Sequence, residues 1–224
     1  MKTHTERLLL PGPAGTIEVA RDVPNSVPAG APPRGVAVIA HPHPLFGGTM
    51  DNKVVQTLAR AFVQAGWTAL RFNFRGVGAS SGTHDEGRGE LQDLLAVVQQ
   101  LAPPAQDGLP AQPLALAGFS FGAFVTSHAL AALWPERRIA HVVLVGTATT
   151  RFAVAPVPPE AQLRTLVLHG EQDDVVPLAS VFDWARPQAL PVMVIPGVGH
   201  FFHGQLPLLK SLVLRHLRAT ADDA

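Results

Sequence analysis

Hydrophobic residues recur along the chain as short apolar runs separated by longer segments with a helical spacing of apolar positions. Apolar runs of four to eight residues are typical of strands buried on both faces of a parallel sheet. Thr16–Ala20 predicts a short edge strand. The alternation of apolar and polar residues over Trp67–Phe74 predicts another strand. The apolar runs predict strands over Gly35–Ala40, Leu114–Phe119, His141–Gly146, Arg164–Gly170 and Pro191–Ile195.

The segments between these strands carry apolar residues three and four positions apart, which predicts amphipathic helices. A turn-rich loop is expected over Asp22–Arg34. Alternation of strands and helices predicts an α/β fold, a mostly parallel central sheet with helices on both faces, in a single domain over residues 1–224. The first predicted helix begins at Asp51 or Asn52 and ends at Gln64. The others span Glu90–Leu101, Ala123–Leu133, Ser180–Ala185 and Leu206–Arg218.

Charge and cysteine content exclude several classes of function. Lys and Arg together number 17, as do Asp and Glu, and the chain has no cysteine. A neutral chain without charged blocks offers nothing to a nucleic acid or an anionic membrane surface, and without cysteine there is no disulfide, thiolate nucleophile or thiolate metal site. The apolar stretch Leu8–Leu10 is too short for a signal peptide core, so we expect a cytoplasmic protein. Its expected partner is a small-molecule substrate, and a homodimer is left open as its assembly.

The predicted strand Leu114–Phe119 ends in Gly118-Phe119-Ser120-Phe121-Gly122, a G-x-S-x-G sequence. This pattern is typical of a nucleophile elbow, a sharp strand-to-helix turn with the serine hydroxyl at its tip. The glycines are needed because a Cβ atom would clash where strand and helix approach closely. Ser80 lies in a second match, but no strand runs directly into it and no helix leaves it. We therefore predict Ser120 as the nucleophile.

Glycines at 76, 78 and 82 raise the alternative of a nucleotide-binding loop. Their spacing, G-x-G-x-x-x-G, differs from the dinucleotide fingerprint, and a polar stretch precedes the next predicted helix. A turn is the better interpretation of residues 76–82, and no cofactor is expected.

In parallel sheets, ligands gather beyond the carboxyl ends of the strands. Acidic residues Glu171, Asp173 and Asp174 follow one predicted strand, and His200 follows the last. The chain order serine, acid, histidine is that of the α/β-hydrolase triad, in which histidine takes the serine proton and the acid orients the imidazole. His200 is preferred to the nearby His203, which is expected at the surface.

The chain resembles the α/β-hydrolase superfamily along most of its length. The segments His41-Pro-His-Pro-Leu-Phe-Gly-Gly-Thr-Met50 and Arg71-Phe-Asn-Phe-Arg-Gly-Val-Gly78 resemble a group of small lidless bacterial serine hydrolases. Within the superfamily an H-G-x-x-D-x-x-V-P segment carries the triad acid, which implies Asp173 and leaves Glu171 and Asp174 as solvated loop charges.

Two backbone donors are needed for the oxyanion that forms during acyl transfer. The first is expected to be the amide of Phe121, directly after the nucleophile. The resemblance implies that the second lies just past His41-Pro42, at His43 or Leu45, because Pro44 has no N–H. His41 and His43 also form an H-x-H pair, but no further ligand follows nearby, and His169 is expected to be a core histidine.

These features predict a serine hydrolase that cleaves carboxylic esters or thioesters through an acyl-enzyme. Residues Thr147–Leu163 are too few for a helical cap, so the site should be open and short acyl chains preferred. The alternatives are a peptidase or amidase on the same triad, a metal hydrolase, and a non-catalytic binding protein of the same fold.

Overall fold

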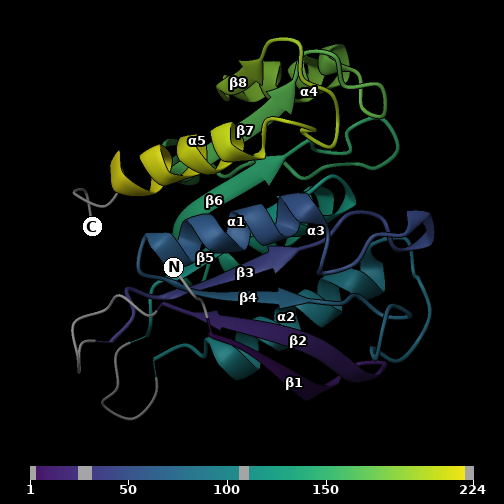
Figure 1. Ribbon diagram of the computed structural model, residues 1–224, viewed down its shortest axis with the longest axis vertical. Helices are drawn as coiled ribbons and strands as arrows, with labels where there is room; N and C mark the ends of the chain where they lie inside the picture. Colours follow the sequence, from purple (N-terminus) through teal and green to yellow (C-terminus); the bar gives the residue numbers. More distant parts are fainter. Residues whose placement is uncertain (1–3, 25–31, 106–110, 220–224) are drawn as a thin grey trace.

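The computed structural model describes residues 4–24, 32–105 and 111–219 (Figure 1). Residues 25–31 of the expected loop Asp22–Arg34 lie outside this description. The strands are β1 (His4–Gly12), β2 (Gly15–Val23), β3 (Val36–Ala40), β4 (Thr68–Phe72), β5 (Leu114–Phe119), β6 (Ile139–Val145), β7 (Thr165–Gly170) and β8 (Val192–Ile195). The α-helices are α1 (Lys53–Gln64), α2 (Arg88–Leu101), α3 (Phe121–Leu133), α4 (Leu178–Ala185) and α5 (Leu206–Ala219). Short 3-10 helices are η1 (Pro44–Phe46), η2 (Pro159–Arg164) and η3 (Arg186–Gln188).

All the strands form one sheet with the order β1-β2-β4-β3-β5-β6-β7-β8. From β4 to β8 every neighbouring pair is parallel, whereas β1 and β2 join antiparallel at one edge. The carboxyl ends of β3, β5, β6, β7 and β8 therefore open at the same side of the sheet. The elements predicted from residue 35 onward are all present, with ends that differ from the prediction by at most two residues.

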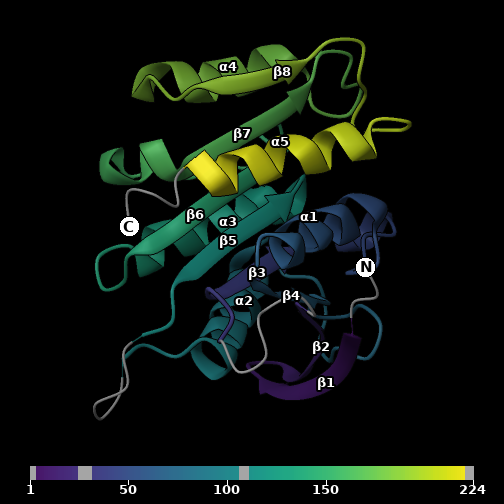
Figure 2. The ribbon, with the colours of Figure 1, turned by 60° about the vertical axis from the view of Figure 1, so that its left-hand side comes forward.

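Helices cover both faces of this sheet (Figures 1 and 2). Helices α1 and α5 lie side by side on one face, and α2, α3 and α4 pack on the other. Because side chains alternate along a strand, Val38 and Leu116 join the α2 and α3 core while Ile39 and Ala117 join the α1 and α5 core. This explains why the central strands are apolar at every position.

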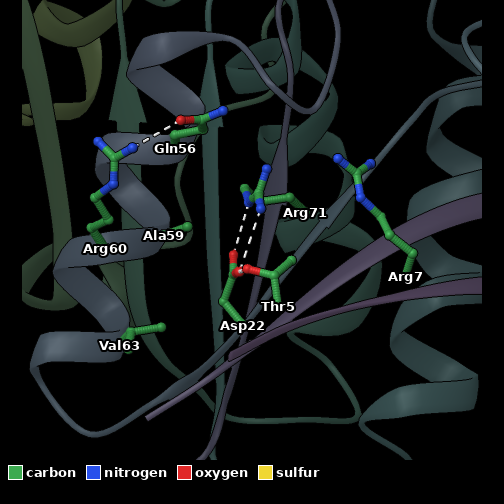
Figure 3. A pocket seen from close by; sticks show the side chains of 8 residues that line it. All are labelled: Thr5, Arg7, Asp22, Gln56, Ala59, Arg60, Val63 and Arg71. Atoms are coloured by element: carbon green, nitrogen blue, oxygen red, sulfur yellow. Dashed lines mark hydrogen bonds and ion pairs between the residues drawn. The ribbon is translucent and has the colours of Figure 1, made fainter. Parts of the chain in front are cut away.

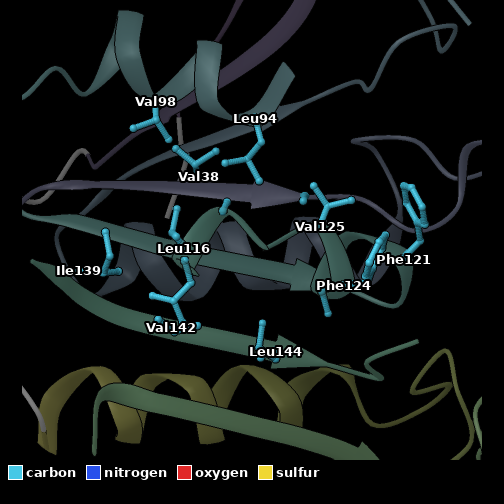
Figure 4. Close-up of a cluster of buried hydrophobic side chains, with 14 of the residues drawn as sticks. Val38, Leu94, Val98, Leu116, Phe121, Phe124, Val125, Ile139, Val142 and Leu144 are labelled. Carbon is cyan, nitrogen blue, oxygen red and sulfur yellow. The ribbon is translucent and has the colours of Figure 1, made fainter. Parts of the chain in front are cut away.

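The core between the sheet and α2 is closely packed (Figure 4). Leu94 and Val98 of α2 point toward Val38 of β3, and all three side chains are at most 3% exposed. Burying each such side chain contributes roughly 1.5–3 kcal/mol. The packing holds the β5–α3 junction, from which Phe121 also enters this core, in place.

The N-terminal edge of the sheet differs from the sequence prediction. The segment expected as an edge strand, Thr16–Ala20, belongs to β2, which lies between β1 and β4. The true edge is β1, where Leu8 and Leu10 are only half-buried and alternate with exposed residues. A strand with one solvated face has a weaker apolar pattern than a central strand, which is why the prediction omitted it.

The connection between β6 and β7 is short, as the residue count predicted. Residues 146–164, all of which the structure describes, contain η2 and no α-helix, so this connection forms no helical cap. None of the helices in the described residues has the length and apolar composition that crossing a membrane requires.

Candidate active site

Ser120 occupies the sharp turn between β5 and α3. Its backbone has φ +56° and ψ −117°, a combination that non-glycine residues rarely adopt. The amide of Ser120 donates to the carbonyl oxygen of Val145 in β6 at 2.8 Å, which holds the turn against the neighbouring strand. This geometry is that of a nucleophile elbow, as the G-x-S-x-G pattern predicted.

Both glycines of the motif are required by close backbone contacts. A Cβ atom on Gly118 would lie 2.3 Å from the carbonyl oxygen of Gly122. A Cβ atom on Gly122 would lie 2.4 Å from the carbonyl oxygen of Ala40, at the end of β3. The expected crowding of strand and helix is thus confirmed, and α3 also approaches the adjacent strand β3.

A chain of side-chain contacts links three elements at the carboxyl end of the sheet. Nε2 of His200 lies 3.0 Å from Oγ of Ser120, and Nδ1 of the same ring lies 2.7 Å from Oδ2 of Asp173. All three residues are less than a tenth exposed. An ionised carboxylate can only accept hydrogen bonds, so Nδ1 carries the ring proton and Nε2 is left to accept from the serine hydroxyl. Such an arrangement can transfer the hydroxyl proton to the imidazole.

The carboxylate of Asp173 is held by its own loop. Its Oδ1 accepts from the amides of Val175 and Val176 at 3.0 and 2.7 Å. Burial alone would raise the pKa of Asp173, but the hydrogen bonds from His200 and Val176 hold that pKa below its usual value. The carboxylate is therefore ionised at neutral pH and restrains the imidazole.

A second histidine, His169 at the end of β7, lies against the same carboxylate. Its ring is fully buried, and Nε2 donates to the carbonyl oxygen of Val176 at 2.8 Å and lies 3.4 Å from Oδ2 of Asp173. Burial lowers the pKa of His169, so the ring is neutral. The sequence correctly indicated a buried histidine but not its contact with the acid.

The competing residues lie elsewhere or at the surface. Glu171 and Asp174 are exposed, and so is His203. Ser80 is buried, donates to the carbonyl oxygen of Asn73 at 2.7 Å and accepts from the amide of Glu18 at 2.9 Å. Ser80 therefore ties a turn to the sheet.

The segment after β3 contains the two predicted positions for a second oxyanion donor. His43 lines the same cavity as Ser120, whereas the amide of Leu45 donates to Nδ1 of His43 at 3.2 Å. Leu45 is 69% exposed. The amide of Leu45 is thus already engaged by a side chain.

His41 anchors the start of this segment. Its Nδ1 donates to the carbonyl oxygen of Pro42 at 2.6 Å, and Nε2 accepts from the amide of Phe74 at 3.0 Å. Burial lowers the pKa of His41 to about 4. Both ring nitrogens are occupied, so the H-x-H pair has no free nitrogen at His41 for a metal. Within the described ranges no three His, Asp or Glu side chains are grouped so as to hold a metal ion.

The C-terminal end of the segment His41–Met50 is held by residues of the second motif that carries the resemblance, Arg71–Gly78. Arg71 donates to the carbonyl oxygen of Met50 at 3.0 Å, and the amide of Met50 donates to Oδ1 of Asn73 at 2.9 Å. Arg71 is itself paired with Asp22 and Asp51 at 2.9 Å. These contacts fix the loop that passes beside Ser120.

A cavity of about 370 Å³ opens at Ser120 and His200. Four phenylalanines contribute to its walls, and one arginine lies at its rim. The full lining comprises Pro42, His43, Phe46, Gly47, Gly48, Asn52, Ser120, Phe121, Ala148, Thr150, Arg151, Phe152, Val175, Val176, His200 and Phe201. The sequence interpretation missed Arg151 and Phe152. They follow the carboxyl end of β6, and the strand-end rule that found Asp173 and His200 would have found them too.

A separate cavity of about 400 Å³ lies between β1, β2, β4 and α1 (Figure 3). Arg71 and Asp22 form an ion pair in its wall, with Thr5 donating to the same carboxylate. Nη2 of Arg60 donates a hydrogen bond to Oε1 of Gln56 at 2.9 Å. This cavity contains none of the predicted site residues. Two of its charged groups, Arg71 and Asp22, pair with each other, whereas Arg7 pairs with Glu18 and Asp51 outside the cavity.

Comparison with known proteins agrees with the observed fold. The model of a family described as "alpha/beta hydrolase fold" matches residues 43–164. An uncharacterized protein of Rickettsia prowazekii is 32% identical over 207 residues, which cover 85% of this chain and 79% of that protein.

Two solved structures are similar along almost their whole length. An α/β serine hydrolase without lid from Xanthomonas campestris is 34% identical, with a TM-score of 0.83, and the match covers 98% of this chain and 96% of that one. An α/β serine hydrolase homologue from Coxiella burnetii is 36% identical, with a TM-score of 0.75 and coverage of 97% and 99%.

Proposed function

Because the chain belongs to the α/β-hydrolase family, we propose that it is a serine hydrolase that cleaves carboxylic esters or thioesters. The observation that carries the proposal is the contact of Ser120 Oγ with His200 Nε2 at 3.0 Å, together with that of His200 Nδ1 with Asp173 at 2.7 Å. A serine hydroxyl is a weak nucleophile, and a base within hydrogen-bond distance is what activates it.

The reaction proceeds in two halves. Ser120 Oγ attacks the substrate carbonyl carbon while His200 Nε2 takes the hydroxyl proton, and Asp173 stabilises the resulting imidazolium. His200 then returns the proton to the leaving alcohol or thiol, whose bond to the acyl carbon breaks. In the second half a water molecule loses a proton to His200 and attacks the acyl carbon. The bond from that carbon to Ser120 Oγ then breaks while His200 returns the proton to Oγ, which releases the carboxylic acid and restores Ser120.

The tetrahedral intermediate of each half carries a negative oxygen that needs backbone donors. Phe121 is the first residue of α3, so its amide has no carbonyl partner within the helix and is available to an anion. For the second donor we favour His43 over Leu45. The amide of Leu45 already donates to His43 Nδ1, while His43 shares the cavity with Ser120.

Reaction with a fluorophosphonate probe tests this assignment. The wild-type protein, Ser120→Ala and Ser80→Ala would be labelled, and the modified residue mapped by peptide mass spectrometry. We expect label on Ser120 in the wild type and in Ser80→Ala, and none in Ser120→Ala. Label on Ser80, or undiminished ester hydrolysis by Ser120→Ala, would contradict the proposal.

A further inference from the structure

Arg151 is the one residue with a permanently charged side chain among those that line the cavity at Ser120. The remaining lining side chains are apolar, neutral polar or histidine, and none is a carboxylate or a lysine. A single guanidinium at the rim of a largely apolar cavity suits a substrate that combines an apolar body with one negative group.

We propose that Arg151 binds a free carboxylate on the substrate, so that the preferred substrates are esters or thioesters that carry a second, ionised carboxyl group. This inference rests on the proposed hydrolase function of the same site and extends it by predicting the charge of the substrate.

Arg151 differs from the structural arginines of the chain in its partners. Arg71 and Arg75 each lie 2.9 Å from an aspartate oxygen, and both are largely buried. In the part of the chain that the structure describes, no ion pair joins Arg151 to a carboxylate of the protein. Its N–H donors are therefore available to an external anion, which a guanidinium binds through two parallel hydrogen bonds.

The position of the Arg151 guanidinium is restrained by an aromatic ring. Its Cζ lies 5.6 Å from the ring centroid of Phe46, within cation–π range. Phe46 belongs to η1, in the loop after β3, whereas Arg151 lies in the loop after β6. The pair thus bridges the two loops on either side of Ser120.

Other titratable groups lie near Arg151, and within the described residues none of them forms an ion pair with it. An adjoining hollow, which Arg151 also lines, contains His84, Glu86 and His128, and Glu86 is the one carboxylate in its lining. Burial, together with the neighbouring His84 and Arg151, lowers the pKa of His43. His43 is therefore neutral at pH 7, and Arg151 is the permanent charge that a substrate meets.

Two matched substrate pairs test the proposal by titration of released acid at pH 7.5. In the first pair, monomethyl adipate carries the carboxylate on the acyl side, and the corresponding methyl ester amide is its neutral counterpart. In the second, 4-acetoxybenzoate carries it on the leaving group, with 4-acetoxybenzamide as counterpart. We expect kcat/KM for the carboxylate member of at least one pair to exceed that of the amide about tenfold, the size of a charge-assisted hydrogen bond.

Variants distinguish an effect of Arg151 on kcat/KM from an effect of the overall charge of the protein. Arg151→Gln should lower the carboxylate-to-amide ratio of kcat/KM about tenfold, to near one, mainly through KM, and Arg151→Lys should restore part of it. Arg215→Gln, at an exposed position on α5, removes the same charge elsewhere and should leave the ratio unchanged.

Equal kcat/KM for both members of both pairs in the wild type would overturn the proposal, as would an unchanged ratio in Arg151→Gln. Ser120→Ala serves as the independent check. If it still hydrolyses all four esters, the proposed hydrolase function of Ser120 fails, whereas a change confined to the ratio concerns Arg151 alone.

Discussion

Oδ2 of Asp173 lies 2.7 Å from Nδ1 of His200, although 27 residues separate the two in the chain. The contact joins the loop after β7 to the loop after β8, which meet because β7 and β8 are parallel neighbours. Because the carboxylate only accepts, it determines which ring nitrogen carries the proton and so which one can accept from Ser120.

Replacing this carboxylate with an amide should remove most of the activity. An asparagine at 173 can donate to Nδ1 and favour the wrong tautomer of His200, so we expect Asp173→Asn to lower kcat about 10³- to 10⁴-fold. The measurement is kcat for p-nitrophenyl acetate, with circular dichroism as a test of folding. Asp174→Asn is the matched control because Asp174 is exposed. Similar activities of the two variants would contradict the assignment of the acid.

Ser80→Ala should lower stability without lowering turnover. The buried hydroxyl of Ser80 donates to Asn73 and accepts from the amide of Glu18, and its loss leaves both groups unpaired. We expect the free energy of unfolding, measured in urea, to fall by about 1–3 kcal/mol. Ser120→Ala should show the opposite pattern, with near-normal stability and no turnover. The hypothesis fails if Ser80→Ala is as inactive as Ser120→Ala while remaining folded.

The buried ring of His41 should make stability fall as the solution is acidified. The folded-state pKa of His41 is about 4, below the unfolded value of 6.5, so the unfolded chain binds a proton first. The stabilisation is complete above about pH 6.5 and is lost as pH falls toward 4, and it amounts to roughly 3 kcal/mol for a difference of this size.

Urea unfolding of wild type and His41→Gln between pH 4 and 7.5 measures this effect. The pH dependence should be weaker in His41→Gln, because the substituted amide does not titrate. His203→Gln is the control, since His203 is exposed and its replacement should leave the dependence unchanged. An identical pH dependence in all three proteins would rule out the role of His41.

The open site should favour short acyl chains. With no cap between β6 and β7, little apolar surface can enclose a long chain, and each methylene contributes about 0.8 kcal/mol only where it is buried. We expect kcat/KM for p-nitrophenyl esters to stop rising beyond a few carbons. The series from acetate to palmitate tests this, with and without a lipid interface. A maximum at twelve carbons or more, or a jump in activity at the interface, would contradict the expectation.

The sequence alone determined the features that depend on local pattern. Central strands such as β5 are apolar at every position because both faces are covered, and this pattern can be read without knowing their neighbours. The elbow at Ser120 is local in part: a Cβ atom on Gly118 would meet Gly122 within the same five residues, whereas the clash at Gly122 is with Ala40 of the neighbouring strand β3.

Only the tertiary structure decided what depends on contacts between distant segments. The half-solvated β1 was identifiable only through its pairing with β2, and the contact of His169 with Asp173 only through the folded loop after β7. Arg151 joins the cavity because the loop after β6 ends beside the loop after β3, with 104 residues between Phe46 and Arg151. Residue patterns record which face of an element is buried, but the partners of a side chain depend on the order of the strands in the sheet.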